Sequence, residues 1–211
     1  MNQYYPVFLN VHGKRCVVVG GGEVALRKVG VLLDHGADVI VVSPSTCSEL
    51  GVLCHEKKIE IILRKYRTVD LEGAFIVIAA SDERDVNRKI TADAKSRRVL
   101  INVVDDPVAS DFLIPSSMNR GNLTVAVSTG GKSPALARKI KNELELYFSE
   151  EYIVLTDLVA EVRSELKNMG VKPGNDIWQK ALDLGLLLDL LHKGQREKAK
   201  AVLLGNLEIP G

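Results

Sequence analysis

A short glycine-rich stretch is the first part of the sequence whose residue types and spacing could do chemistry. It reads Gly20-Gly21-Gly22-Glu23-Val24-Ala25, which fits the pattern G-x-G-x-x-A. In such a turn Gly20 permits the tight bend, Gly22 lets a pyrophosphate approach the backbone, and Ala25 lets a helix pack on a strand. The N–H groups at the start of that helix attract phosphates. The pattern predicts a dinucleotide site, and the alternative is a tight turn with no ligand.

The acidic residue that usually binds the ribose hydroxyls of such a cofactor is missing. It should lie about 20 residues further on, at the end of the next strand, where the sequence reads Val42-Ser43-Pro44-Ser45. Lys57 and Lys58 are too far along the chain to form an obvious site for the extra phosphate of NADP. We therefore expect hydroxyl or backbone groups to hold the ribose, and the choice between NAD and NADP stays open.

A second group with chemical potential is Asn102-Val-Val-Asp105-Asp106-Pro107. It follows a predicted strand, at the end where open α/β sheets bind ligands. A carboxylate at Asp105 could accept a proton from a substrate that is losing a hydride, or could bind a metal ion. The alternative is a solvated loop acid or a helix cap.

The third group is the glycine-rich loop Ser128-Thr129-Gly130-Gly131-Lys132-Ser133-Pro134. A P-loop would need glycine where Ala126 stands, so we reject ATP binding. What remains is a glycine-rich turn before a helix N-terminus, which suits a carboxylate ligand. A local basic cluster surrounds this loop, although a solvated helix face would explain it equally well: Arg120, Lys132, Arg138, Lys139 and Lys141.

Alternating strand and helix patterns predict the fold that must position these groups. We expect an α/β fold with a Rossmann-type doubly wound parallel sheet, then a small α+β module and a C-terminal helical domain. The domains expected are 1–111, 112–149 and 150–211. The expected strands are 15–20, 38–43, 59–64, 74–80, 99–104, 112–115 and 123–129, and the expected helices are 23–35, 83–97, 134–148, 150–168, 175–192 and 195–204.

Composition limits the classes of function. The 211 residues include 28 Lys and Arg against 27 Asp and Glu, which argues against a nucleic-acid partner. Cys16, Cys47 and Cys54 lack the paired spacing of a zinc site, so we expect no resident metal and reduced thiols. No apolar stretch is long enough for a membrane span, and we expect a soluble, cytoplasmic protein.

Five motifs taken in order carry a resemblance to a known family. They are Tyr5-Pro-Val-Phe, the glycine turn followed by Arg27-Lys28, Ala79-Ala-Ser-Asp82 with Asn87, the segment 102–105, and the segment 125–138. Together they resemble the precorrin-2 dehydrogenase family. This family is the dehydrogenase and ferrochelatase part of siroheme synthase, here without the methyltransferase domain of larger members.

The resemblance implies an enzyme that oxidises precorrin-2 to sirohydrochlorin with NAD as the hydride acceptor. Some members also insert Fe²⁺ to give siroheme, and whether this chain does so stays open. Asp105 takes the catalytic position. The expected cofactor contacts are Gly20, Gly21, Gly22, Glu23, Val24, Ser43, Pro44, Ser45 and Ser81, and the expected contacts to the tetrapyrrole are Asn102, Arg120, Ser128, Thr129, Gly130, Gly131, Lys132 and Arg138.

The family also implies a homodimer in which the segments at 112–148 interlock, which makes the small α+β module at 112–149 a dimerisation module. An exposed hairpin supports this expectation, because a two-stranded ribbon is marginally stable unless something covers it. Two alternatives remain. A non-catalytic NAD-sensing module would need neither Asp105 nor the basic glycine loop, and a ferrochelatase that works without NAD would not need the glycine turn.

Overall fold

The computed structural model describes residues 4–207. The chain divides between residues 114 and 115 into two compact units, and each is described here by itself. The second unit holds the hairpin that follows residue 115 together with all the C-terminal helices. The expected division into three domains stays a prediction.

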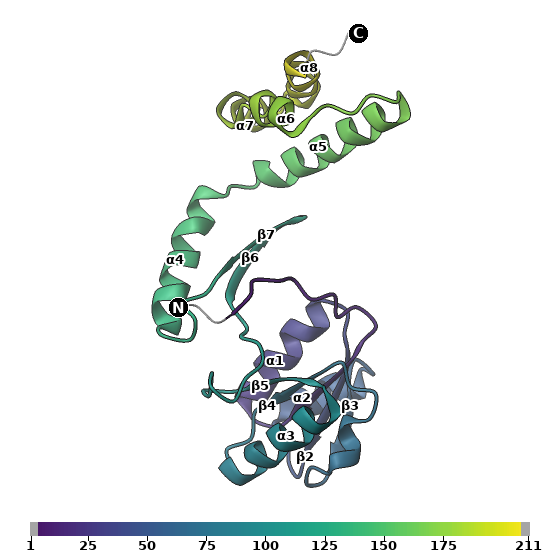
Figure 1. The fold of residues 1–211 in the computed structure, drawn as a ribbon, viewed down its shortest axis with the longest axis vertical. Helices are drawn as coiled ribbons and strands as arrows, with labels where there is room; N and C mark the ends of the chain where they lie inside the picture. Colours follow the sequence, from purple (N-terminus) through teal and green to yellow (C-terminus); the bar gives the residue numbers. More distant parts are fainter. Residues whose placement is uncertain (1–3, 208–211) are drawn as a thin grey trace. The chain divides into compact units, whose positions relative to one another are not determined.

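The first unit is built on a five-stranded parallel sheet in the order β3-β2-β1-β4-β5 (Figure 1). The order reverses between β1 and β4, which is the switch point of a doubly wound sheet. The predicted fold class is confirmed. The strands are β1 (Arg15–Val19), β2 (Asp38–Ser43), β3 (Glu60–Leu63), β4 (Ile76–Ala79) and β5 (Leu100–Val103).

Helices cover both faces of this sheet, because successive side chains of the strands point to opposite faces and almost all are apolar. In β1, Val18 belongs to the core under one set of helices, and Val17 belongs to the core under the other. The helices are α1 (Glu23–Asp34) and α2 (Ser48–His55) on the first core, and η1 (Thr68–Leu71) and α3 (Arg84–Arg97) on the second.

Up to residue 115, three segments differ from the sequence-based prediction: α2, the short helix η1, which no pattern predicted, and residues 112–115. Helix α2 was not predicted, because it has only eight residues and buries a single side chain, that of Leu50. The segment 112–115 was predicted as a strand, and this prediction is wrong. Its apolar side chains Phe112 and Ile114 pack against the first core instead, and Pro115 has no N–H to donate to a ladder.

The second unit begins with an antiparallel hairpin against which α4 packs. Residues 116–120, which lie between two predicted strands, form its first strand. The predicted helix 175–192 is two helices, because Asp183 accepts a hydrogen bond from the N–H of Leu186 and caps a new one. The elements are β6 (Ser116–Arg120), β7 (Leu123–Val127), α4 (Pro134–Tyr147), α5 (Glu151–Asn168), α6 (Asn175–Ala181), α7 (Leu184–His192) and α8 (Arg196–Asn206).

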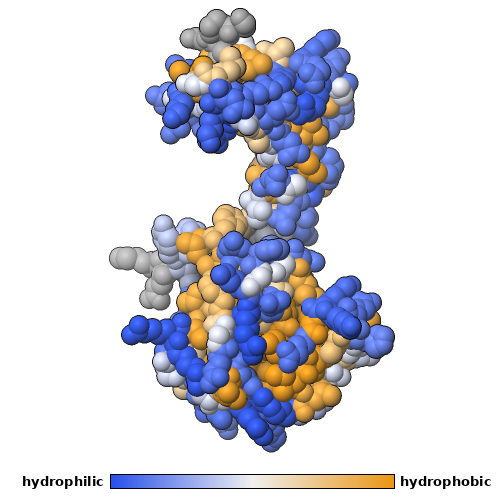
Figure 2. Space-filling model, turned by 90° about the vertical axis from the view of Figure 1, so that its right-hand side faces the viewer, coloured by the Kyte–Doolittle hydropathy of each residue, from blue (hydrophilic) through white to orange (hydrophobic). Residues whose placement is uncertain are grey.

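Hydrophobic side chains also reach the surface of both units, as the orange residues in Figure 2 show. In the first unit Phe8 is 76% exposed, and in the second Tyr147 is 69% exposed. No helix within residues 4–207 combines the length and the apolar composition needed to cross a membrane.

The turn after β1 allows a test of backbone constraint. Gly20 has a φ of 134°, and a Cβ there would overlap the carbonyl of Ala80. A Cβ at Gly22 would meet no atom within 4 Å. We expect Gly20→Ala to lower the free energy of unfolding by roughly 3 kcal/mol or more, and Gly22→Ala to lower it by less than about 1 kcal/mol. Urea unfolding followed by circular dichroism measures both, and equal losses would contradict this account.

Candidate active site

The carboxyl ends of the parallel strands bring most of the predicted site residues of the first unit to one edge of the sheet. β1 leads into the glycine turn, β2 into Ser43–Ser45, β4 into Ser81, and β5 into Asp105. Ligands of open α/β sheets bind in the crevice at this edge. The structure thus collects side chains that are more than 80 residues apart in the sequence.

The glycine turn is held between the neighbouring strands. The N–H of Gly20 donates to the carbonyl of Val42 at 3.0 Å, and the N–H of Ala80 donates to the carbonyl of Val19 at 2.8 Å. Gly22 is the N-cap of α1, and no side chain caps this helix end. The N–H groups of the first turn, including those of Glu23 and Val24, therefore remain suited to bind an anion.

Two further observations fit a dinucleotide at this turn. The space beyond the Cα of Gly22 is open, so a pyrophosphate can approach the backbone there. Close to the end of β4, Asn87 donates from Nδ2 to the carbonyl of Ser81 at 2.8 Å. Its Oδ1 is buried and finds no hydrogen-bond partner among residues 4–207. A buried acceptor of this kind calls for a donor from a ligand or a water molecule.

The loop after β2 folds back onto the glycine turn. The N–H of Cys47 donates to the carbonyl of Gly21 at 2.7 Å, and a Cβ on Gly21 would overlap the carbonyl of Ser45. The hydroxyl of Ser43 donates to that same carbonyl at 2.6 Å, and Ser43 is buried. Pro44 and Ser45 are exposed. The Ser43 hydroxyl thus holds the loop, which leaves Pro44 and Ser45 at the surface beside the turn.

Asp105 lies exposed just beyond β5 with a φ of 59°, in the left-handed region. Backbone bonds around it fix this bend, since the N–H of Val104 donates to the carbonyl of Ala79 and that of Asp106 to the carbonyl of Val103. Non-glycine residues adopt this conformation rarely, and such outliers gather at functional sites.

Lys28 of α1 is a candidate site residue to which the sequence assigned no separate role. It is half-buried; burial and then the charge of Arg27 lower its pKa, whereas the charge of Asp105 acts in the opposite direction. The charge of Asp105 is therefore near enough to act on the pKa of Lys28. The sequence places Lys28 on the helix after the glycine turn, which is a signal that it could belong to the site. Only the fold relates this lysine to Asp105, which is 77 positions later.

Asn102 has a clear structural role. It is buried, and its Nδ2 donates to the carbonyl of Phe112 at 3.0 Å, which fastens the segment after β5 to the sheet. Its expected contact with a substrate stays a prediction.

In the second unit, hydroxyl groups shape the glycine-rich loop. Thr129 accepts from the N–H of Ser133 at 2.9 Å, and Ser128 accepts from the N–H of Gly130 at 3.1 Å. Ser133 in turn caps α4 by accepting from Leu136. Gly130 and Gly131 both have positive φ values. The loop is therefore a well-defined turn in front of α4.

The basic cluster around this loop is smaller than the sequence indicates. Arg120 donates to the carbonyls of Phe148 and Glu145 and so holds the end of α4. Lys139 and Lys141 form ion pairs four residues along the same helix, with Glu143 and Glu145. Within residues 4–207, Lys132 and Arg138 make no ion pair and are exposed.

A cavity of about 590 Å³ lies elsewhere in the second unit. Its acidic groups Glu150, Glu151 and Asp189 outnumber the basic groups Arg120 and His192. His192 pairs through Nδ1 with Glu151 at 2.7 Å. This lining does not suit a ligand with many carboxylates.

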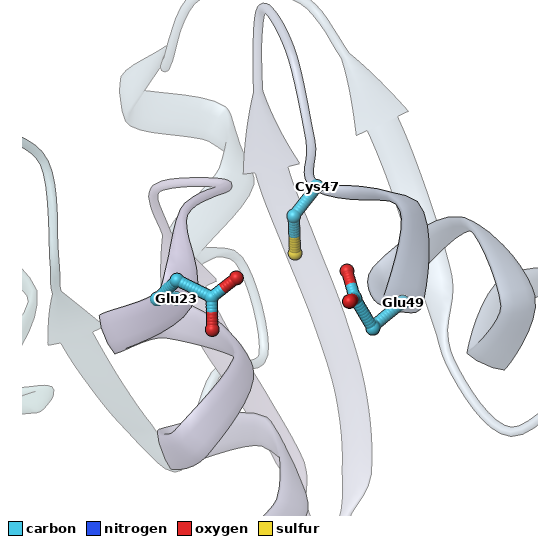
Figure 3. Close-up of side chains that lie close together, drawn as sticks. All are labelled: Glu23, Cys47 and Glu49. Carbon is cyan, nitrogen blue, oxygen red and sulfur yellow. The ribbon is translucent and has the colours of Figure 1, made fainter.

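The structure also places Glu23, Cys47 and Glu49 together, a group that no pattern in the sequence indicated. Figure 3 shows the three side chains directed toward one another, from the start of α1, the end of the loop after β2 and the start of α2. One ligand atom from each lies within 4.8 Å of the others. Only Glu23 among them was predicted as a site residue.

Two family models match the chain. One, described as "Putative NAD(P)-binding", covers residues 7–116, and the other, described as "Sirohaem biosynthesis protein central", covers residues 120–145. The first match spans slightly more than half of the chain and coincides with the first unit and its glycine turn.

Individual proteins give the same result. The chain is 36% identical over 208 residues to a siroheme synthase of Nitrosococcus oceani and 37% identical over 204 residues to one of Pseudomonas fluorescens. These alignments cover 98% and 96% of this chain but 44% of each relative.

A solved structure titled SirC, precorrin-2 dehydrogenase, matches with a TM-score of 0.70 at 26% identity, covering 98% of this chain and 100% of that one. The family models, the sequence relatives and this structure agree with the glycine turn and sheet described above. The chain therefore belongs to the precorrin-2 dehydrogenase family, which forms the NAD(P)-binding part of siroheme synthases.

Proposed function

We propose that the protein oxidises precorrin-2 to sirohydrochlorin with NAD as the hydride acceptor. The observation that carries this proposal is the position of Asp105. Asp105 follows β5 and the glycine turn follows β1 at the same edge of the parallel sheet, and the charge of Asp105 acts to raise the pKa of Lys28 on the helix that begins at this turn. A sensor module would need the turn alone.

The reaction removes two hydrogens from the macrocycle, one as a hydride and one as a proton. NAD, when bound, supplies the acceptor for the hydride. Asp105 accepts the proton. The first turn of α1 binds the pyrophosphate, and Asn87 offers its buried Oδ1 to a donor of the cofactor.

The substrate carries many carboxylates and needs cations that are not already paired. Lys132 and Arg138 are exposed and fulfil this condition, whereas Arg120 is engaged with backbone carbonyls. We therefore assign the carboxylates of the substrate first to these two residues and to the loop of Ser128, Thr129 and the two glycines.

Iron insertion stays a prediction of the family resemblance. Within residues 4–207, the group of side chains close enough to share a metal ion is Glu23, Cys47 and Glu49, and it does not include Asp105. The geometry supports dehydrogenation more directly than iron insertion.

The first experiment tests cofactor binding. Gly22→Asp places a negative charge where the pyrophosphate meets the backbone, while an aspartate is a favourable N-cap and keeps α1 stable. We expect the dissociation constant for NAD⁺ to rise at least about a hundredfold, with an unchanged melting temperature. Calorimetric titration measures this effect, and Gly22→Ser, a neutral N-cap, is the control for side-chain size. Equal affinities of the aspartate variant and the wild type would reject the assignment.

The second experiment tests Asp105. Asparagine tolerates the left-handed conformation, so Asp105→Asn removes the charge without straining the backbone. We expect a fall of about 10²- to 10⁴-fold in the rate of NADH formation from precorrin-2 under anaerobic conditions. Asp106→Asn is the matched control, because Asp106 is also exposed and its role of accepting from Ala109 survives in the amide. Full activity of Asp105→Asn would assign the proton to another group.

We also propose that the protein works as a homodimer in the cytoplasm. Three exposed apolar side chains lie on one face of α4, at Leu136, Ile140 and Tyr147, four and seven residues apart. Such a face without a partner favours association, and both strands of the hairpin beside it are edge strands. A symmetric partner would satisfy both.

The dimer is tested by charging this face. Wild-type protein should scatter light as a particle of twice the 23.1 kDa of one chain. Ile140→Glu should give a particle of single-chain mass at micromolar concentration. Leu146→Glu is the control, since Leu146 is 87% exposed but points to another side of α4. A wild type of single-chain mass, or an Ile140→Glu variant that remains dimeric, would reject this interface.

A further inference from the structure

The acidic group of Glu23, Cys47 and Glu49 lies directly beside the proposed dinucleotide site. Glu23 follows the N-cap of α1, and Cys47 is bound to the glycine turn through its N–H. Glu49 lies in the first turn of α2, and its carboxylate is within 4.8 Å of the other two ligand atoms (Figure 3). In a Rossmann fold the adenosine ribose lies between the glycine turn and the end of the second strand.

The usual position of the ribose-binding acid is closed in this protein. That position is the end of β2, where Ser43 is buried and directs its hydroxyl to the carbonyl of Ser45. The Oγ of Ser43 would also lie only 2.8 Å from a Cβ on Gly21, so there is little room for a carboxylate between them. An acid that binds the ribose must therefore come from another element.

Helix α2 offers such an acid and keeps it ionised. The hydroxyl of Ser48 donates to Oε2 of Glu49 at 2.9 Å. The backbone N–H of Glu49, followed by the Ser48 hydroxyl, lowers the pKa of this carboxyl, and the Cys47 thiol contributes in the same direction. Glu49 is exposed, so its remaining acceptor positions are accessible to a ligand.

We propose that Glu49 accepts hydrogen bonds from the ribose hydroxyls of the adenosine half of the cofactor and, with Glu23, excludes a 2′-phosphate. The protein would then bind NAD in preference to NADP. This inference rests on the proposed function, because it concerns the same dinucleotide site. It assigns the cofactor choice to a residue six positions beyond the end of β2.

Charge supports this assignment. A 2′-phosphate would approach two carboxylates that already lie close together, and like charges at such distances repel. Lys58, a cation near the end of α2, pairs with Glu56 at 2.8 Å. Arg27 lies one turn of α1 beyond Glu23 and is the residue that would favour the phosphate.

The experiment compares NADH with NADPH by the fluorescence change on binding to the full-length protein, in the presence of EDTA. For the wild type we expect NADH to bind at least about tenfold more tightly than NADPH. Glu49→Gln should weaken NADH binding about three- to tenfold and should strengthen NADPH binding, so that the preference largely disappears. Glu72→Gln removes the same charge from an exposed position after η1, on the other core of the sheet, and should keep the wild-type preference.

The outcomes separate this inference from the proposed function. If the wild type binds neither dinucleotide, the proposed function fails and the inference fails with it. If NADH binds but Glu49→Gln keeps the wild-type preference, or loses both ligands equally, only the inference is overturned. A wild-type preference for NADPH would also overturn it and would point to Arg27, and a preference present only without EDTA would assign it to a metal ion.

Discussion

The parallel pairing of β1 with β2 on one side and with β4 on the other is the constraint on which the site depends. It sets the carboxyl ends of three strands side by side, so the turn after β1 is enclosed by the loops after its neighbours. Only glycine can occupy position 20, since its backbone is pressed against Ala80 with a φ that other residues rarely adopt. The opening for a ligand at Gly22 is a consequence of this close packing at Gly20 and Gly21.

Short polar bonds then give each loop at this edge one conformation. Ser43 ties the loop after β2 to itself, and Asn87 ties the start of the loop after β4 to α3. Asp105 is held in a left-handed bend between two backbone hydrogen bonds. These residues do not need to contact a ligand to matter, because they fix where the exposed groups beside them point.

The sequence was sufficient for the sheet of the first unit, because five apolar runs ended by turn residues have few other interpretations. It was sufficient for the glycine turn for the same reason. It did not indicate helix α2, which buries one side chain. It also did not indicate the loop at 112–115, whose apolar side chains pack against the first core although the segment is not a strand. Nor did it indicate Lys28 near Asp105 or Glu49 beside Glu23. Such pairs form where two elements of secondary structure pack together, and no local sequence pattern predicts them.

The segment after Asp105 limits how a second chain can pair with the sheet of the first unit. Its residues run back along β5, where Asp111 exchanges two hydrogen bonds with the backbone of Ile101 and Ser110 does the same with Val103. The outer backbone groups of an edge strand are thereby occupied, although no sixth strand is formed. An open edge is a template on which another chain can add a strand and start aggregation. On this side the sheet offers no such template, so a second chain can meet the β5 edge only through side chains and not by adding a strand.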